Sequence, residues 1–143
     1  MPRHISLVFP GQGSQSLGML NDFCHDDIAS IKPALTELPF DLIDIIQNDP
    51  EDLLKKTSIT QPALLATSYL HYKKFLSLTN TLPDIIAGHS LGEYSALVAA
   101  DSIKLKDAIS LVHKRGLFME SSEKGSMFAI LNLDLSFVID ICN

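Results

Sequence analysis

The sequence predicts an α/β fold in which short parallel strands alternate with helices. Two apolar runs, His4–Phe9 and Asp84–Gly88, have the character of strands, and a long helical stretch separates them. Strands that are apolar throughout are typical of a parallel sheet that helices cover on both faces. Because two strands make a poor sheet, we expect this sheet to be incomplete, with its other strands beyond Asn143. The alternative is a helical domain that carries a small sheet.

Helices account for most of the chain between the two strands. After a loop of Gly, Gln and Ser at residues 10–16, the sequence predicts short helices at 17–24, 28–38 and 41–47. The segment Asn48–Asp52 starts another helix, because a capping residue, then proline, then acidic residues favour a helix N-terminus. A longer helix begins at Thr60, where apolar residues follow at helical spacing.

The elements after the second strand form two groups. Helices are predicted at Glu93–Ala100 and Lys104–Ser121, and Gly125 interrupts the pattern. A third strand at Met127–Leu131 and a final helix from Leu135 to Ile141 follow. The third strand follows a break in composition, and the last helix has nothing left to pair with, which indicates that the fold is incomplete in this chain.

The motif Gly88-His89-Ser90-Leu91-Gly92 lies between the second strand and a helix. In that context Gly-x-Ser-x-Gly presents the serine hydroxyl on a sharp turn. The N-terminus of the following helix directs N–H groups to the same place, where they stabilise negative charge on a carbonyl oxygen. We therefore interpret Ser90 as a nucleophile that forms an acyl-enzyme. The alternative is a turn that merely joins a strand to a helix.

A second loop, Gly11-Gln12-Gly13, follows the first strand. Loops after parallel strands share one edge of the sheet, so the backbone N–H groups of Gln12 and Leu91 could form an oxyanion hole together. A dinucleotide loop is excluded because Ser16 occupies the third glycine position. A glycine turn without a ligand stays an alternative.

Arg115 lies on an apolar helix face with Ala108, Val112 and Met119. A guanidinium in that position must find an anion or carbonyl groups, and it can hold a carboxylate by two parallel hydrogen bonds. We interpret Arg115 as a clamp for an acidic acyl group. The alternative is an arginine whose head reaches solvent.

None of the five histidines is a good base for Ser90. His89 is adjacent, but neighbouring side chains at a tight turn point apart. Either the base lies outside this chain or there is no serine chemistry. No cluster of metal-ligand spacing stands out, so we expect no metal site.

The composition restricts the class of protein. The net charge of −6 and the absence of a long basic patch argue against nucleic acid as a partner. No apolar run approaches the length of a membrane span, and there is no leader sequence, so we expect a cytoplasmic protein. Cys24 and Cys142 lie far apart, which indicates reduced thiols.

Four blocks together resemble the malonyl-CoA:acyl carrier protein transacylase family, the acyltransferases of fatty acid and polyketide synthesis. They are Phe9–Gln15, Thr60–Ala63, Gly88–Leu97 and Arg115-Gly116 followed by Met119. The resemblance implies an α/β-hydrolase-like core with an inserted ferredoxin-like subdomain. Residues 1–124 would then be the N-terminal part of the core, and residues 125–143 the beginning of the subdomain. Asp101 departs from the family pattern, which usually has glycine there.

The resemblance also implies roles for individual residues. Ser90 would be the nucleophile, Gln12 and Leu91 the oxyanion-hole residues, Arg115 the ligand of the malonyl carboxylate, and His89 a neighbour of the acyl pocket. The family's catalytic histidine lies further along and has no counterpart here. The implied reaction uses malonyl-CoA and acyl carrier protein and needs no cofactor, because the coenzyme A thioester is a substrate. The enzyme would act as a monomer in fatty acid biosynthesis. The alternatives are a serine esterase or thioesterase on a similar core, and an inactive fragment.

Overall fold

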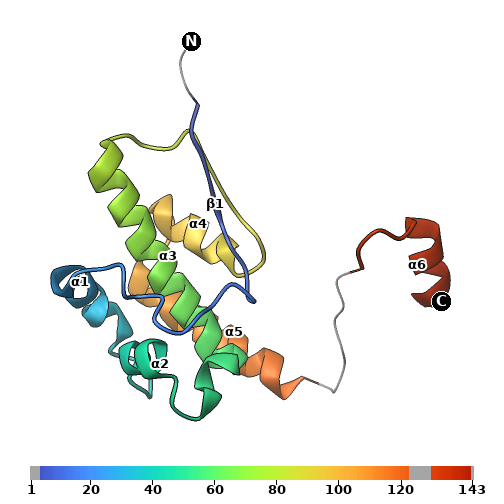
Figure 1. The fold of residues 1–143 in the computed structure, drawn as a ribbon, viewed down its shortest axis with the longest axis horizontal. Helices are drawn as coiled ribbons and strands as arrows, with labels where there is room; N and C mark the ends of the chain where they lie inside the picture. The colour runs from blue at the N-terminus through green and yellow to red at the C-terminus, as the bar shows by residue number, and fades with distance from the viewer. Residues whose placement is uncertain (1–3, 123–129, 143) are drawn as a thin grey trace.

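The computed structural model describes residues 4–122 and 130–142, and shows a short parallel sheet next to a group of helices (Figure 1). The elements follow in the order β1 (Ser6–Phe9), α1 (His25–Leu35), α2 (Leu42–Asn48), the 3-10 helix η1 (Pro50–Lys55), α3 (Thr57–Thr79), β2 (Ile85–Gly88), α4 (Gly92–Ala99), α5 (Leu105–Ser121) and α6 (Leu135–Cys142). The predicted α/β class is confirmed. No helix in the described ranges is long and apolar enough to cross a membrane.

The strands β1 and β2 pair in parallel, with Ser6 opposite Ile85 and Phe9 opposite Gly88. One face of the pair packs on helices: Phe9 is 5% exposed, and its ring meets the edge of Tyr72 in α3. On the other face, Val8 is 70% exposed and Ile85 59%. The apolar strands predict helices on both faces, and the described helices cover one of them.

Helix α3 runs through the middle of the helical group (Figure 1). Residues 58–68 are buried on every side, which no surface helix would tolerate. The helix begins at Thr57, three residues before the predicted start at Thr60. The Glu120 carboxylate of α5 accepts a hydrogen bond from the backbone N–H of Ser58 at 2.7 Å, so a distant residue satisfies a donor of the first turn.

Two predicted elements need correction. The helix predicted at 17–24 is wrong: these residues form turns, in which Gly18 has φ +70° and its N–H bonds to the Ile46 carbonyl oxygen at 2.8 Å. The predicted third strand falls mostly outside the described residues, and Ile130 and Leu131 lie in no strand. The final helix is confirmed as α6, which lies apart from the other helices (Figure 1). The boundary predicted at 124/125 also lies outside the described residues, and the division stays a prediction.

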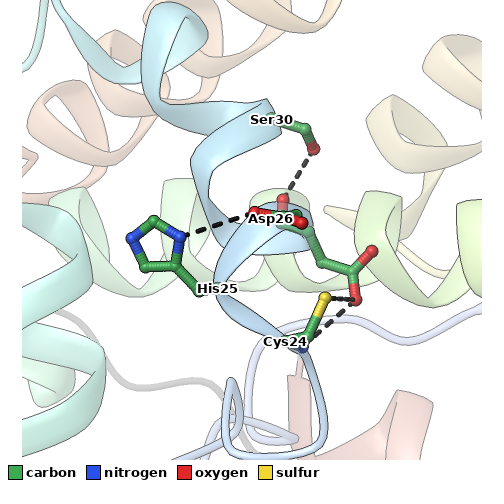
Figure 2. Close-up of polar contacts among 5 residues, drawn as sticks. Cys24, His25, Asp26 and Ser30 are labelled. Carbon is green, nitrogen blue, oxygen red and sulfur yellow. Dashed lines mark hydrogen bonds and ion pairs between the residues drawn. The ribbon is translucent and has the colours of Figure 1, made fainter.

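A cluster of Cys24, His25, Asp26 and Asp27 at the start of α1 has the residue types of a catalytic site (Figure 2). Its contacts are those of a helix cap. The Asp27 carboxylate accepts from the backbone N–H and the thiol of Cys24, both at 3.1 Å, and His25 pairs with Asp26 at 3.6 Å. Cys24 and Cys142 are both free and exposed, in agreement with the predicted thiols.

Candidate active site

The chain turns sharply between β2 and α4, and Ser90 stands at the turn. Ser90 is exposed and has φ +52°, a left-handed conformation that costs a non-glycine residue about 1–2 kcal/mol. The turn is tight because a Cβ on Gly88 would lie 2.0 Å from the carbonyl carbon of Gly92. Strain that the surroundings enforce at an exposed hydroxyl is a signature of functional sites.

The loop after β1 lies directly against this turn. The His89 N–H bonds to the Phe9 carbonyl oxygen at 3.0 Å. A Cβ on Gly11 would lie 2.7 Å from Nδ1 of His89, so the imidazole packs against the glycine loop. The structure thus brings Gln12 and Leu91, the two predicted oxyanion-hole residues, to one edge of the sheet. Leu91 is 1% exposed, so its side chain anchors the start of α4 in the core.

Gln12 is held by its side chain as well as by the loop. Its amide Nε2 donates to the Thr57 hydroxyl at 3.2 Å, on the first turn of α3. This contact ties the glycine loop to the central helix.

Arg115 of α5 reaches the serine. Its Nη2 donates to Ser90 Oγ at 3.3 Å, and its Nη1 donates to Gln61 Oε1 at 2.8 Å. The guanidinium also lies over the Tyr94 ring, 5.8 Å from its centroid. The predicted inward direction of Arg115 agrees with these contacts, and its head is half-buried rather than extended into solvent.

Gly116 allows α5 to come this close. A Cβ at that position would lie 2.4 Å from the Cα of Ser58, so the helices α3 and α5 touch backbone to backbone there. Any side chain larger than hydrogen would separate them and move Arg115 away from Gln61 and Ser90.

Two hollows lie near these elements. An apolar groove of about 460 Å³ runs along α5 from Leu111 to Ser122, and Arg115 is among the residues that line it. A pocket of about 480 Å³ lies beside β1 and α3, and none of the predicted site residues lines it. The groove is therefore the hollow that adjoins the candidate site.

The five histidines are engaged elsewhere in the part of the chain that the structure describes. His113 Nδ1 lies 2.9 Å from the Ser58 carbonyl oxygen, His4 pairs with Asp84, and His25 pairs with Asp26. His71 packs against Phe23, and partial burial lowers its pKa. With His89 against Gly11, none of them is placed as the base that Ser90 would need.

The strain at Ser90 predicts a measurable gain in stability. We expect Ser90→Gly to be about 1 kcal/mol more stable than Ser90→Ala, because glycine adopts φ +52° without steric cost. Both variants lack the hydroxyl, so their difference isolates the backbone. Urea unfolding followed by circular dichroism measures it, and equal midpoints would show that the turn is unstrained.

Sequence reasoning missed Gln61, which is completely buried and bonded to Arg115. The available signal was a glutamine inside an apolar helix next to Pro62, since a buried amide must find partners. Its partner lies 54 positions away, which no local pattern reveals.

The sequence model of the acyl transferase domain family matches residues 6–138. A malonyl CoA-acyl carrier protein transacylase of Haemophilus influenzae is 43% identical over 98% of this chain and 47% of its own length. The chain spans about half the length of the curated relatives it matches.

Solved structures agree with the sequence relatives. The malonyl-CoA:acyl carrier protein transacylase of Xanthomonas oryzae superposes with a TM-score of 0.86 at 36% identity, over 99% of this chain and 48% of that one. A malonyl-transacylase in complex with its type II polyketide synthase acyl carrier protein gives a TM-score of 0.70 at 44% identity, over 82% of this chain and 39% of that one.

Proposed function

The chain belongs to the acyl transferase domain family, and from this we propose that it carries the nucleophile of a malonyl-CoA:acyl carrier protein transacylase. The reaction passes malonyl from coenzyme A to the phosphopantetheine thiol of the carrier protein, through a malonyl-serine intermediate. The observation that carries the proposal is the 3.3 Å contact between Arg115 Nη2 and a strained Ser90. A guanidinium, which is suited to hold a carboxylate, thus lies beside an exposed hydroxyl, and this supports the proposal.

The first half-reaction makes an ester. Ser90 Oγ attacks the thioester carbonyl carbon, the C–S bond breaks, and coenzyme A leaves as a thiol that takes up the hydroxyl proton. The N–H groups of Gln12 and Leu91 stabilise the negative charge on the carbonyl oxygen during the attack. Arg115 holds the free carboxylate of the malonyl group, which an acetyl group lacks.

The second half-reaction reverses the first with another thiol. The phosphopantetheine thiol attacks the serine ester, and the Ser90 hydroxyl is restored. The groove beside Arg115 is a suitable path for such a flexible arm. The relative solved with its acyl carrier protein supports a carrier protein as the acceptor.

The 143 residues by themselves should turn over poorly. A general base contributes about 10²–10⁴-fold to such reactions, and none of the histidines in the described residues contacts Ser90. We therefore propose that this chain alone is acylated slowly and transfers little.

We also propose that the protein is cytoplasmic and monomeric.

Discharge of the acylated chain tests the acceptor. We expect holo-acyl carrier protein to remove malonyl from Ser90 faster than buffer does, because the thiol and not water is the acceptor. Intact mass spectrometry over time measures both rates, and apo-carrier protein without the arm is the control. Rapid loss in buffer alone, which holo-protein does not accelerate, would indicate an esterase.

A further inference from the structure

The buried amide of Gln61 is bonded at both ends. Its Oε1 accepts from Arg115 Nη1 at 2.8 Å, and its Nε2 lies 3.2 Å from the Met119 sulfur. Gln61 is 0% exposed, so these two contacts, one helical turn apart on α5, replace water completely. Buried amides that are satisfied in this way are rigid and directional.

The direction of the amide follows from the chemistry of its partners. A guanidinium has donors only, so the oxygen of Gln61 must face Arg115. The nitrogen then needs an acceptor, and the Met119 thioether is a weak one. Met119 thus keeps the amide from turning over and presenting a donor to Arg115.

The partner of Arg115, Gln61, carries no charge, and this matters for the function of the guanidinium. An arginine that is partly or fully buried often pairs with a carboxylate, which cancels its charge. Gln61 is a neutral acceptor of almost the same shape as glutamate, so it can fix the guanidinium and leave the positive charge uncompensated. Tyr94 offers only a ring face and does not neutralise the charge either.

We propose that Gln61 is a positioning residue, which orients Arg115 toward Ser90 while preserving its charge for the carboxylate of the acyl group. The carboxylate part of this proposal rests on the proposed function. Orientation before binding lowers the entropy lost when the acyl group binds. The side-chain hydrogen bonds of Gln61 go to Arg115 and Met119, and Gln61 holds Nη1 of the guanidinium while Nη2 donates to Ser90.

Two variants separate orientation from charge. Gln61→Met keeps the volume and removes the acceptor, so Arg115 should become mobile. Gln61→Glu keeps the acceptor and adds a negative charge, so Arg115 should stay in place but hold a carboxylate poorly. Thr67→Val, on the same helix, is the matched control, because it removes a buried hydroxyl that forms no hydrogen bond within the part of the chain that the structure describes.

Arginine side-chain NMR of the unliganded chain measures how firmly the Arg115 side chain is held in its orientation. The sequence has two arginines, Arg3 and Arg115, so the two Nε–Hε signals are readily assigned. We expect the Arg115 side chain to be rigid on the nanosecond timescale in the wild type, Gln61→Glu and Thr67→Val, and mobile in Gln61→Met. Phenylglyoxal should then modify Arg115 several-fold faster in Gln61→Met. Equal mobility of Arg115 in Gln61→Met and wild type would overturn the proposal.

The ratio of the acylation rates of Ser90 by malonyl-CoA and by acetyl-CoA tests whether the charge of Arg115 is available to a carboxylate. We expect Gln61→Glu to lose most of the preference for malonyl while Arg115 stays rigid, a combination that a merely structural role would not produce. An unchanged preference in Gln61→Glu would refute the role of the neutral amide. If the wild type showed no preference for malonyl, the proposed function would fail, and the NMR comparison would still decide the orientation of Arg115.

Discussion

Gly92→Ala should remove a large share of the free energy of unfolding of the protein. The added Cβ would lie 2.3 Å from the carbonyl oxygen of Phe9 and 2.8 Å from that of Pro10. Both are backbone atoms at the end of β1, and neither can rotate away as a side chain would. Overpacking typically costs about 1–3 kcal/mol, and we expect this clash with fixed backbone to reach the upper end, about 3 kcal/mol, of the roughly 5–15 kcal/mol that typical domains possess. Urea unfolding measures the loss.

Gly13→Ala is the matched control for this effect. Gly13 has φ +107°, but no atom lies within 4 Å of the place that a Cβ would take, so alanine there meets only backbone strain of about 1–2 kcal/mol. Both variants add one methyl group, Gly92→Ala at the start of α4 and Gly13→Ala in the loop after β1. If Gly92→Ala were no less stable than Gly13→Ala, the close approach of β1 and the serine turn would be wrong.

Arg115→Leu should abolish the preference for malonyl. The substitution removes the hydrogen bonds and the charge that hold the carboxylate, and each charge-assisted hydrogen bond contributes about 1.5–3 kcal/mol. We expect acylation of Ser90 by malonyl-CoA to slow about a hundredfold or more. Acylation by acetyl-CoA, which has no carboxylate, should change little. Parallel time courses by intact mass spectrometry give the ratio of the two rates.

Lys114→Leu makes the same change of charge one position away. Lys114 is exposed, so its loss alters the local field without touching the guanidinium. We expect it to leave the ratio of the two rates nearly unchanged. A similar fall in both variants would assign the preference to general electrostatic attraction and remove Arg115 from its proposed role.

The local parts of the fold were predictable from the sequence. The strands β1 and β2, the helix α2 and the serine turn each carry their own signal: an apolar run, a capping aspartate, or paired glycines. The helix predicted at 17–24 failed because consecutive turns bring Leu20 and Phe23 into the core and leave Leu17 exposed. Gly18 is bonded to Ile46 in another element. The spacing of apolar residues in the sequence does not distinguish a helix from consecutive turns.

The candidate site depends on contacts that spacing cannot reveal. Glu120 accepts a hydrogen bond from Ser58 in the first turn of α3, and Gln61 accepts one from Arg115. In each pair the partners lie more than 50 positions apart in the sequence. The apolar strands predicted two covered faces, whereas Val8 and Ile85 are exposed in the described structure. The apolar composition of a strand shows that it is suited to burial on both faces. It does not show which element covers each face.

The most direct test of the account is the site at which malonyl-CoA acylates this chain. Incubation followed by intact mass spectrometry and peptide mapping should find one malonyl group, on Ser90, and none on Ser90→Ala. A malonyl group on another residue, or equal labelling of Ser90→Ala, would contradict the claim that the strained serine beside Arg115 is the nucleophile.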